Sequence, residues 1–278
     1  MQEKISNLQT RDFLVTQENF ELVYDYKTDM LVTKPVPKDL AKYYDPNNYI
    51  SHSDDSNSLL EKIYQLVKKY TLNKKVQLIN TYTNQEKKLL DIGCGTGEFL
   101  IHAKNKNWKT VGVELNDQAR QKASNKKIDT FKSLENLNNQ KFDVITLWHV
   151  LEHLPNLEDQ ILKIKSLLEK NGTLIIAVPN YKSYDAKYYK QYWAAYDTPR
   201  HLWHFSQKAI KKIFAEKNFI VKDTLPMYFD SYYVSLLSEK YKNGSTNYLK
   251  AFYRGLVSNL KAKSTTEYSS LIYVLKKE

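Results

Sequence analysis

The chain has 278 residues, of which 42% are hydrophobic and 26% are charged, as in an ordinary globular protein. Its single cysteine, Cys94, excludes an internal disulfide and a multi-cysteine zinc site. No apolar run reaches the roughly 20 residues that span a bilayer, and the polar first residues lack the core of a signal peptide, so we expect a cytoplasmic protein.

The net charge of +11 raises the question of a nucleic-acid partner. Only four of the 42 basic residues are arginines, the better readers of bases and phosphates, and the lysines are scattered rather than gathered in a stripe. We interpret the charge as a solvated basic surface and expect a small-molecule partner, not a nucleic acid. A homodimer stays open.

Residues 1–57 are polar and contain turn signals at Lys34-Pro35 and Asp45-Pro46, so we treat them as an N-terminal extension. The second unit is expected over 58–278, and it begins with a helix at 58–83. The apolar face of this helix is predicted from three- and four-residue spacing of Leu59, Leu60, Ile63, Leu66, Val67 and Tyr70.

From Lys88 onward, short strands and helices alternate. Strands are predicted at Leu89–Ile92, Thr110–Glu114, Ile128–Phe131, Phe142–Leu147 and Thr173–Val178. Helices are predicted between them at Glu98–Lys106, Asp117–Lys126 and 157–169, the last ending at Asn171-Gly172. This alternation predicts a parallel sheet covered by helices on both faces.

The alternation breaks after Pro179. An aromatic-rich segment at 181–205 precedes a helix that Ser206 is expected to cap, and Phe219–Thr224 is a predicted strand. Two amphipathic helices are expected over 226–265, before a final strand at Leu271–Leu275. We expect 181–205 and 226–265 to form a helical, aromatic lid, because inserts at the carboxyl ends of strands line the ligand crevice.

A glycine-rich turn, Gly93-Cys94-Gly95-Thr96-Gly97, lies between the first strand and helix of this alternation. Such a turn lets the backbone approach a ligand closely, and the next strand ends in an acid, Glu114. Glu114 lies about 20 residues beyond the loop, the separation at which a carboxylate accepts ribose hydroxyls. A dinucleotide site would need a third glycine or alanine where Glu98 stands.

The segment from Leu90 to Leu100 resembles the first motif of class I S-adenosylmethionine-dependent methyltransferases, and the resemblance extends to Thr224. Pro199-Arg200-His201-Leu202 is similar to a subgroup often grouped with ubiquinone-biosynthesis O-methyltransferases. Some members carry an N-terminal zinc ribbon, which this chain lacks, since residues 1–57 contain no cysteine. The resemblance implies a Rossmann-like, doubly wound, mostly parallel seven-stranded sheet with an antiparallel last strand.

The resemblance also implies S-adenosylmethionine as cofactor. Asp91 would orient the loop, while Glu114 would hold the ribose and Leu115 would pack on the adenine. The full predicted cofactor set is Asp91, Gly93, Cys94, Gly95, Thr96, Gly97, Glu114, Leu115, Ser133, Leu134 and His149. Cys94 contributes backbone geometry, because no neighbour in the sequence would make it a nucleophile.

A hydroxyl acceptor requires a base, and His149, His201 and Arg200 are our candidate catalytic residues. His153 and His204 are further candidate imidazoles, although each histidine is also explained as a cap or packing residue. Arg200 could clamp an acidic acceptor or form a structural salt bridge.

His149, Glu152 and His153 would share one face of a helical turn, at a spacing that suits a divalent metal. In the similar O-methyltransferases, residues that match Glu152 and His153 help hold a metal, with glutamate in place of His149. The simpler interpretation is that Glu152 caps backbone amides and His153 packs under the glycine loop. We therefore expect no metal.

The sequence thus predicts methyl transfer, with an oxygen of a small apolar or aromatic acceptor favoured. Alternatives are a nucleic-acid or protein methyltransferase and a non-catalytic cofactor-binding module. The DNA-enzyme motifs Asn-Pro-Pro-Tyr and Asp-Pro-Pro-Tyr are absent, and the lone cysteine lies in the cofactor loop.

Overall fold

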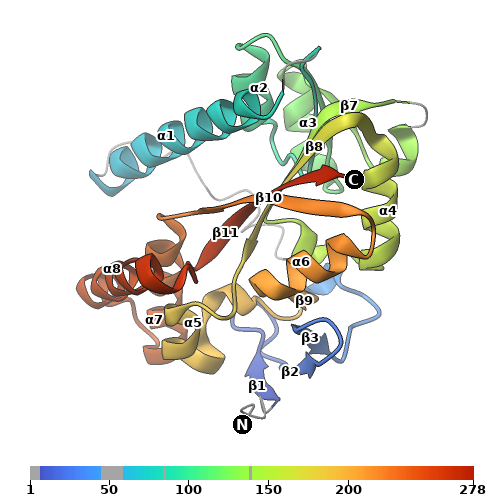
Figure 1. The fold of residues 1–278 in the computed structure, drawn as a ribbon. Helices are drawn as coiled ribbons and strands as arrows, with labels where there is room; N and C mark the ends of the chain where they lie inside the picture. Colours follow the sequence, from blue (N-terminus) through green and yellow to red (C-terminus); the bar gives the residue numbers. More distant parts are fainter. Residues whose placement is uncertain (1–6, 45–58, 84–85, 138–139) are drawn as a thin grey trace.

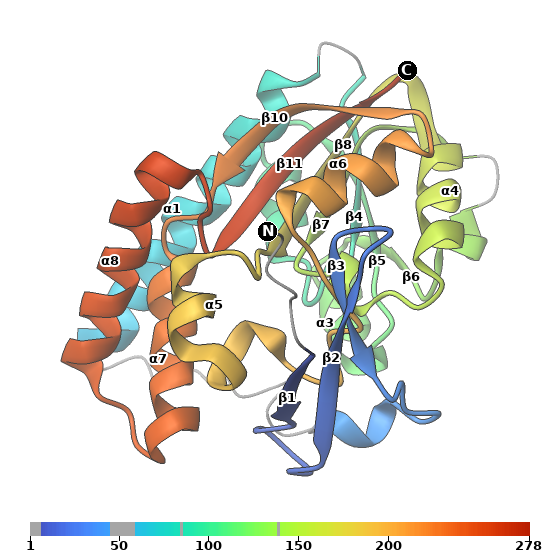
Figure 2. The ribbon, with the colours of Figure 1, turned by 60° about the horizontal axis from the view of Figure 1, so that its bottom comes forward.

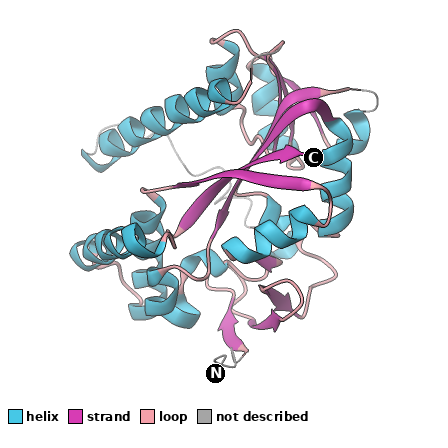
Figure 3. Cartoon of the chain, in the orientation of Figure 1, coloured by secondary structure: helices cyan, strands magenta, loops and turns pink. Residues whose placement is uncertain are grey.

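The centre of the molecule is a seven-stranded sheet with helices on both faces (Figures 1 and 3). The computed structural model describes residues 7–44, 59–83, 86–137 and 140–278. The strands are ordered β10-β11-β8-β7-β4-β5-β6. They comprise β4 (Lys88–Ile92), β5 (Lys109–Val113), β6 (Asp129–Phe131), β7 (Phe142–Trp148), β8 (Leu168–Pro179), β10 (Phe219–Pro226) and β11 (Ser270–Lys277). Only β11 runs against its neighbours, so the predicted fold is confirmed.

The central strands are buried on both sides, which explains their continuous apolar sequences. Leu90 and Ile145 face the cluster that contains α4 (Leu157–Leu167) and α6 (Gln207–Ala215). Their neighbours Leu89 and Val144 face the opposite cluster, with α1 (Leu59–Thr81) and α2 (Glu98–Lys104). Successive residues of a strand point to opposite faces, so every position of these strands meets a helix.

Helix caps follow the local sequence. Ser206 Oγ accepts a hydrogen bond from Ala209 N at 3.0 Å, as predicted for the start of α6. Asn116 caps α3 (Asp117–Asn125) in the same way. The boundary between α4 and β8 differs from the prediction: α4 ends at Leu167 and β8 already begins at Leu168, so Gly172 lies inside the strand rather than ending a helix.

A second, four-stranded sheet was not predicted. It is ordered β1-β2-β3-β9 and contains β1 (Leu8–Arg11), β2 (Asn19–Asp25), β3 (Met30–Lys34) and β9 (Trp203–His204). The short 3-10 helix η1 (Ala41–Tyr43) follows it. Because β3 pairs with β9, the N-terminal segment is joined to the strand just after Pro199–Leu202 (Figure 1). The pairing of β3 with β9 joins segments about 170 residues apart, which no local pattern of the sequence indicates.

The aromatic segment after β8 folds into α5 (Tyr184–Tyr189) and the 3-10 helices η4 (Lys190–Tyr192) and η5 (Ala194–Tyr196). Its rings mostly pack into a core of their own with the small sheet and α7 (Asp230–Asn243). Tyr189 and Trp193 are among the largest fully buried side chains. Figures 1 and 2 show α5, α7 and α8 (Tyr248–Thr265) gathered beyond one end of the sheet.

The predicted apolar face of α8 points outward, not into the core. Leu249 is 86% exposed and Phe252 61% exposed, whereas Ala251, Gly255 and Ser258 are buried. The close approach of α7 explains this, since a Cβ at Gly255 would lie 2.7 Å from a ring carbon of Tyr232.

The predicted apolar face of α1 is also partly exposed. Leu66 and Tyr70 are exposed, whereas Leu72, Val76 and Ile79 are buried. The side chains of residues 59–63 lie outside the described part of the chain. No described helix is long and apolar enough to cross a bilayer.

Candidate active site at the carboxyl edge of the sheet

The predicted cofactor residues follow four neighbouring strands, β7, β4, β5 and β6. These strands are parallel, so their carboxyl ends meet at one edge of the sheet. The structure therefore brings the glycine loop together with Glu114, Ser133 and His149, which follow the other three strands. In doubly wound sheets a ligand binds in the crevice at this edge.

The glycine loop is bent by backbone conformations that other residues rarely adopt. Gly93 has φ +71°, and a Cβ there would lie 2.3 Å from Cγ2 of Val150. Gly95 has φ +53°, and no heavy atom lies within 4 Å of its Cβ position. The first glycine is required by close packing, while the second borders open space. Open space beside Gly95 is what a ligand that touches the loop backbone needs.

Glu114 is held in place by two backbone amides. Its Oε2 accepts a hydrogen bond from Gly95 N at 2.8 Å, and its Oε1 accepts one from Asn116 N at 2.9 Å. The residue is only 5% exposed. Each carboxylate oxygen keeps a further lone pair, so Glu114 can still accept hydrogen bonds from a ligand's hydroxyls.

Asp91 and Lys75 place two ionisable groups beneath the glycine loop. Asp91 accepts a hydrogen bond from Thr146 Oγ1 at 2.6 Å, and burial raises the pKa of its carboxyl to about 7. The Lys75 amine lies 4.2 Å from the ring centroid of Trp148, and burial lowers its pKa to about 8 although Asp91 and Asp230 oppose that change. Sequence reasoning missed Lys75, because α1 is rich in lysines and the pattern does not say which one turns inward.

His149 lies at the end of β7, with φ +57°. Its Nε2 is 3.0 Å from Asp230 Oδ2, and its Nδ1 is 3.4 Å from Glu152 Oε1. Burial disfavours the charged ring, but the two carboxylates outweigh it and raise the pKa of His149 to about 10. The imidazole is therefore protonated at neutral pH in this state. Asp230, the first residue of α7, was not singled out in the sequence.

Arg200 lies in a structural network. Its Nη2 donates to Asp12 at 2.9 Å and to Asp197 at 2.7 Å, while Nη1 donates to the Tyr43 carbonyl oxygen at 2.7 Å. Nε also donates to Asp197. The guanidinium is 6% exposed. Of the two interpretations of Arg200, these contacts favour the structural salt bridge over an acceptor clamp, and they attach β1 to the segment before His201.

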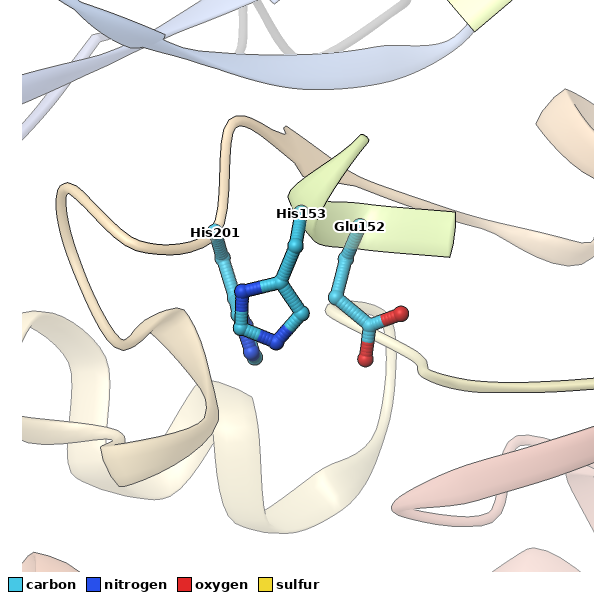
Figure 4. A group of neighbouring side chains, drawn as sticks. All are labelled: Glu152, His153 and His201. Atoms are coloured by element: carbon cyan, nitrogen blue, oxygen red, sulfur yellow. The ribbon is translucent and has the colours of Figure 1, made fainter. Parts of the chain in front are cut away.

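His201 and His153 form a cluster with Glu152 (Figure 4). The ligand atoms of the three side chains lie within 4.8 Å of one another. The expectation that Glu152 caps backbone amides is wrong, because neither carboxylate oxygen accepts a hydrogen bond from a described backbone amide; its nearest partner is His149 Nδ1, 3.4 Å from Oε1. Burial, together with His201, lowers the pKa of His153 to about 4.

His204 is buried and is not part of this cluster. Its Nε2 lies 3.0 Å from Thr33 Oγ1. Burial lowers its pKa well below the ordinary value. Burial also raises the pKa of the Cys94 thiol, in agreement with a role for Cys94 through its backbone alone.

The remaining predicted cofactor residues flank the crevice. Leu115 is 74% exposed beside Glu114, and Leu134 is buried behind Ser133. The hydroxyl of Ser133 contacts Asn136, and the carbonyl oxygen of Thr96 accepts a hydrogen bond from Lys126. The exposed Leu115 side chain is available to pack on a flat ligand ring.

Residues 64–223, more than half of the chain, match a family model described as a methyltransferase domain. The chain belongs to the methyltransferase-domain family. The ubiquinone biosynthesis O-methyltransferase of Glaesserella parasuis serovar 5 is 33% identical over 118 residues, which cover 37% of this chain and 50% of that protein. The enzyme of the same name from Rickettsia akari is 26% identical over 151 residues, covering 51% and 60%. This chain thus matches only half to three-fifths of these curated relatives.

Solved structures share the fold at low sequence identity. Magnesium protoporphyrin IX methyltransferase from Synechocystis PCC 6803, with bound SAH, has a TM-score of 0.53 and 17% identity, covering 82% of this chain and 91% of that one. A cyclopropane synthase from Mycobacterium tuberculosis has a TM-score of 0.52 and 14% identity, covering 74% and 84%. These likenesses confirm the doubly wound fold.

Proposed function

We propose that the chain is an S-adenosylmethionine-dependent methyltransferase that transfers a methyl group to an oxygen of a small apolar or aromatic acceptor. The observation that carries this proposal is the glycine loop, held open beside a buried Glu114 whose oxygens are oriented by Gly95 and Asn116. Family membership supports methyl transfer, and the names of the two curated relatives favour an oxygen acceptor.

The cofactor would bind across the strand ends. Glu114 accepts hydrogen bonds from the ribose hydroxyls, Leu115 packs on the adenine, and Ser133 and Leu134 border the same ring. The methionine part passes along Gly93, Gly95 and Gly97. Lys75 supplies the cation for the methionine carboxylate, since its amine lies over Trp148 rather than against a carboxylate of the protein.

His149 would face the acceptor. Because Asp230 and Glu152 engage both ring N–H groups and hold the ring protonated, His149 faces the acceptor oxygen as a cation and does not accept its proton at neutral pH. This charge favours the ionised acceptor, whose proton would pass to water. The resulting oxyanion would attack the methyl carbon while the bond from that carbon to sulfur breaks. The positive sulfonium of the cofactor already activates its methyl group, so the remaining requirement is to align the acceptor oxygen with that methyl carbon.

The proposed organisation is an N-terminal extension at 1–57 that supports the domain at 58–278. The inserts at 181–205 and 226–265 form the lid, which is supported by the contact between Asp230 and His149. Most rings of the first insert are buried in their own core. The apolar acceptor would therefore contact the exposed Phe229 and Tyr70, whose ring centroids are 5.9 Å apart.

A transfer assay tests the proposal. The protein is incubated with S-adenosylmethionine and matched phenols, catechols, anilines and thiols, and S-adenosylhomocysteine release is measured. We expect turnover with an apolar hydroxyl compound and loss of turnover in Glu114→Ala. Turnover confined to amines or thiols would contradict oxygen transfer, and absence of cofactor binding would contradict the whole proposal.

A further inference from the structure

The ammonium of Lys75 lies against aromatic rings rather than against a carboxylate. Its Nζ is 4.2 Å from the ring centroid of Trp148 and 5.9 Å from that of Phe99. Asp91 and Asp230 act on Lys75 only through their charge, since neither they nor any other described side chain hydrogen-bonds to its amine. Lys75 therefore keeps its full positive charge available for a bound anion.

Helical spacing turns Lys75 toward the sheet. It stands three residues after Leu72 and four before Ile79, both of which are buried, and residues at such spacings share one face of an α-helix. Trp148, the last residue of β7, points into the same layer, because strand side chains alternate and Val144 faces this cluster. The two helices of the layer, α1 and α2, lie side by side over this face of the sheet (Figure 1).

The Trp148 ring is held by packing alone. Phe99, at the start of α2, meets it in a T-shaped contact with ring centroids 5.7 Å apart and an angle of 81° between the planes. Phe99 is only 6% exposed, so it fixes the indole from the core side. The indole Nε1 has no hydrogen-bond partner among the described residues. What Trp148 offers to its surroundings is therefore its ring face, not its N–H group.

An aromatic face suits an ammonium that must still bind an anion. The negative face of the ring attracts the cation without neutralising it, whereas a carboxylate of the protein would compete with the ligand. A lysine side chain also loses much conformational freedom when it is ordered. Contact with Trp148 orders Lys75 before the ligand arrives, so less of that cost falls on binding.

We propose that Trp148, supported by Phe99, is a positioning residue for cofactor binding, whose ring face holds the Lys75 ammonium ready for the cofactor's carboxylate. This inference rests on the proposed function, in which Lys75 contacts that carboxylate. Trp148 acts through Lys75 and needs no contact of its own with the carboxylate. The sequence analysis did not single out Trp148 or Phe99 for any role in the site.

The contact itself is tested in the ligand-free protein. The chain is labelled with lysine that carries ¹³C at Cε, and the Lys75 signal is identified by its absence in Lys75→Met. Protons above a ring face resonate upfield, so we expect the Hε protons of Lys75 to be shifted upfield. Trp148→Leu should abolish that shift, and Trp148→Phe, which keeps a ring and loses no hydrogen bond, should largely preserve it.

A double-mutant cycle tests the consequence for the cofactor. Trp148→Leu should weaken S-adenosylhomocysteine binding about 3- to 30-fold, the range that cation–π contacts span, and Trp148→Phe should restore most of the affinity. In the Lys75→Met background, Trp148→Leu should change the Kd by less than about twofold, since the two residues act as one unit. Binding of decarboxylated S-adenosylmethionine should be unaffected by Trp148→Leu.

The matched control removes a half-buried ring beneath another cation. Phe13→Leu takes away the ring that lies 4.8 Å from the Arg11 guanidinium, next to the small sheet, and should leave the Kd within about twofold. Circular dichroism checks that each variant folds, and Trp148→Met takes the place of Trp148→Leu if the latter does not.

Three results would contradict the positioning role, and they differ in what else they affect. A Lys75 Hε signal that Trp148→Leu leaves unchanged would overturn the role of Trp148, even if the cofactor binds. Equal weakening by Trp148→Leu with and without Lys75→Met would show that Trp148 does not act through Lys75. Absence of S-adenosylhomocysteine binding to the unmodified chain would instead contradict the proposed function, and the positioning role with it.

Discussion

His149 Nε2 lies 3.0 Å from a carboxylate oxygen of Asp230, so the turn after β7 is joined to the first residue of α7. The pair links the sheet edge, where the cofactor is proposed to bind, to the insert proposed to cover the acceptor. One third of the His149 side chain is still exposed. The histidine is thus both held in place by Asp230 and accessible to a ligand.

Replacing Asp230 by asparagine should lower kcat/KM for the acceptor by about 10-fold while leaving the Kd of S-adenosylhomocysteine within twofold. The physical reason is that a neutral amide holds the His149 ring and its charge less firmly, which loosens the position of the acceptor oxygen. Steady-state kinetics and calorimetry measure the two quantities. Asp117→Asn, an exposed carboxylate on α3, is the matched control. A change confined to cofactor affinity would contradict the proposed position of the pair.

Lys75→Met should weaken S-adenosylhomocysteine binding by about 1.5–3 kcal/mol, the range for a hydrogen bond to a charged group. Lys74→Met, which removes the neighbouring exposed lysine, should have no effect. A ligand without the carboxylate, decarboxylated S-adenosylmethionine, should bind the unmodified chain and Lys75→Met equally. If calorimetry shows the same loss for both ligands, Lys75 does not contact the carboxylate.

The same substitution should stabilise the ligand-free protein. Burial lowers the pKa of Lys75 to about 8, so the folded protein binds its proton less tightly than the unfolded chain does. The resulting cost in stability is fully present below about pH 8 and shrinks as the pH rises toward the ordinary value of 10.5. Thermal unfolding of Lys75→Met should therefore show a higher Tm than the unmodified protein at pH 7, and a smaller difference at pH 10. A lower Tm at pH 7 would contradict this cost of the half-buried Lys75 charge.

Arg200→Met should destabilise the fold by about 3–5 kcal/mol, because it leaves the buried Asp12 and the half-buried Asp197 without their cation. Urea unfolding measures this change. Lys88→Met, which breaks an exposed pair with Glu86, should cost less than about 1 kcal/mol. Equal effects of the two substitutions would show that the Arg200 network adds no more than a surface pair does.

The sequence was sufficient to predict the central sheet and the meeting of the glycine loop and Glu114 at one edge of it. Leu89–Ile92 and Phe142–Leu147 are continuous apolar strands, and the glycine loop with Glu114 has a spacing that depends only on local chain geometry. Both the apolar strands and the spacing between the loop and Glu114 are properties of short, continuous segments of the sequence. The described structure places these residues at one edge, as parallel pairing requires.

The missed features depend on contacts between distant segments. Asp230 meets His149, and His201 meets Glu152, only after the inserts fold back on the sheet. The outward face of α8 was missed for a related reason. Periodicity identifies an apolar stripe, but burial depended on the small residues around Gly255, which allow α7 to approach closely.

Calorimetric titration with S-adenosylhomocysteine tests the central claim, that the glycine loop and Glu114 form a cofactor site, most directly. We expect one site per chain, and we expect Glu114→Ala to weaken binding by about 1–3 kcal/mol through unpaired ligand hydroxyls. Glu135→Ala, on an exposed carboxylate of η2 (Leu134–Leu137), should bind as the unmodified chain does. Affinity that is unchanged in Glu114→Ala, or no binding to the unmodified chain, would contradict the account.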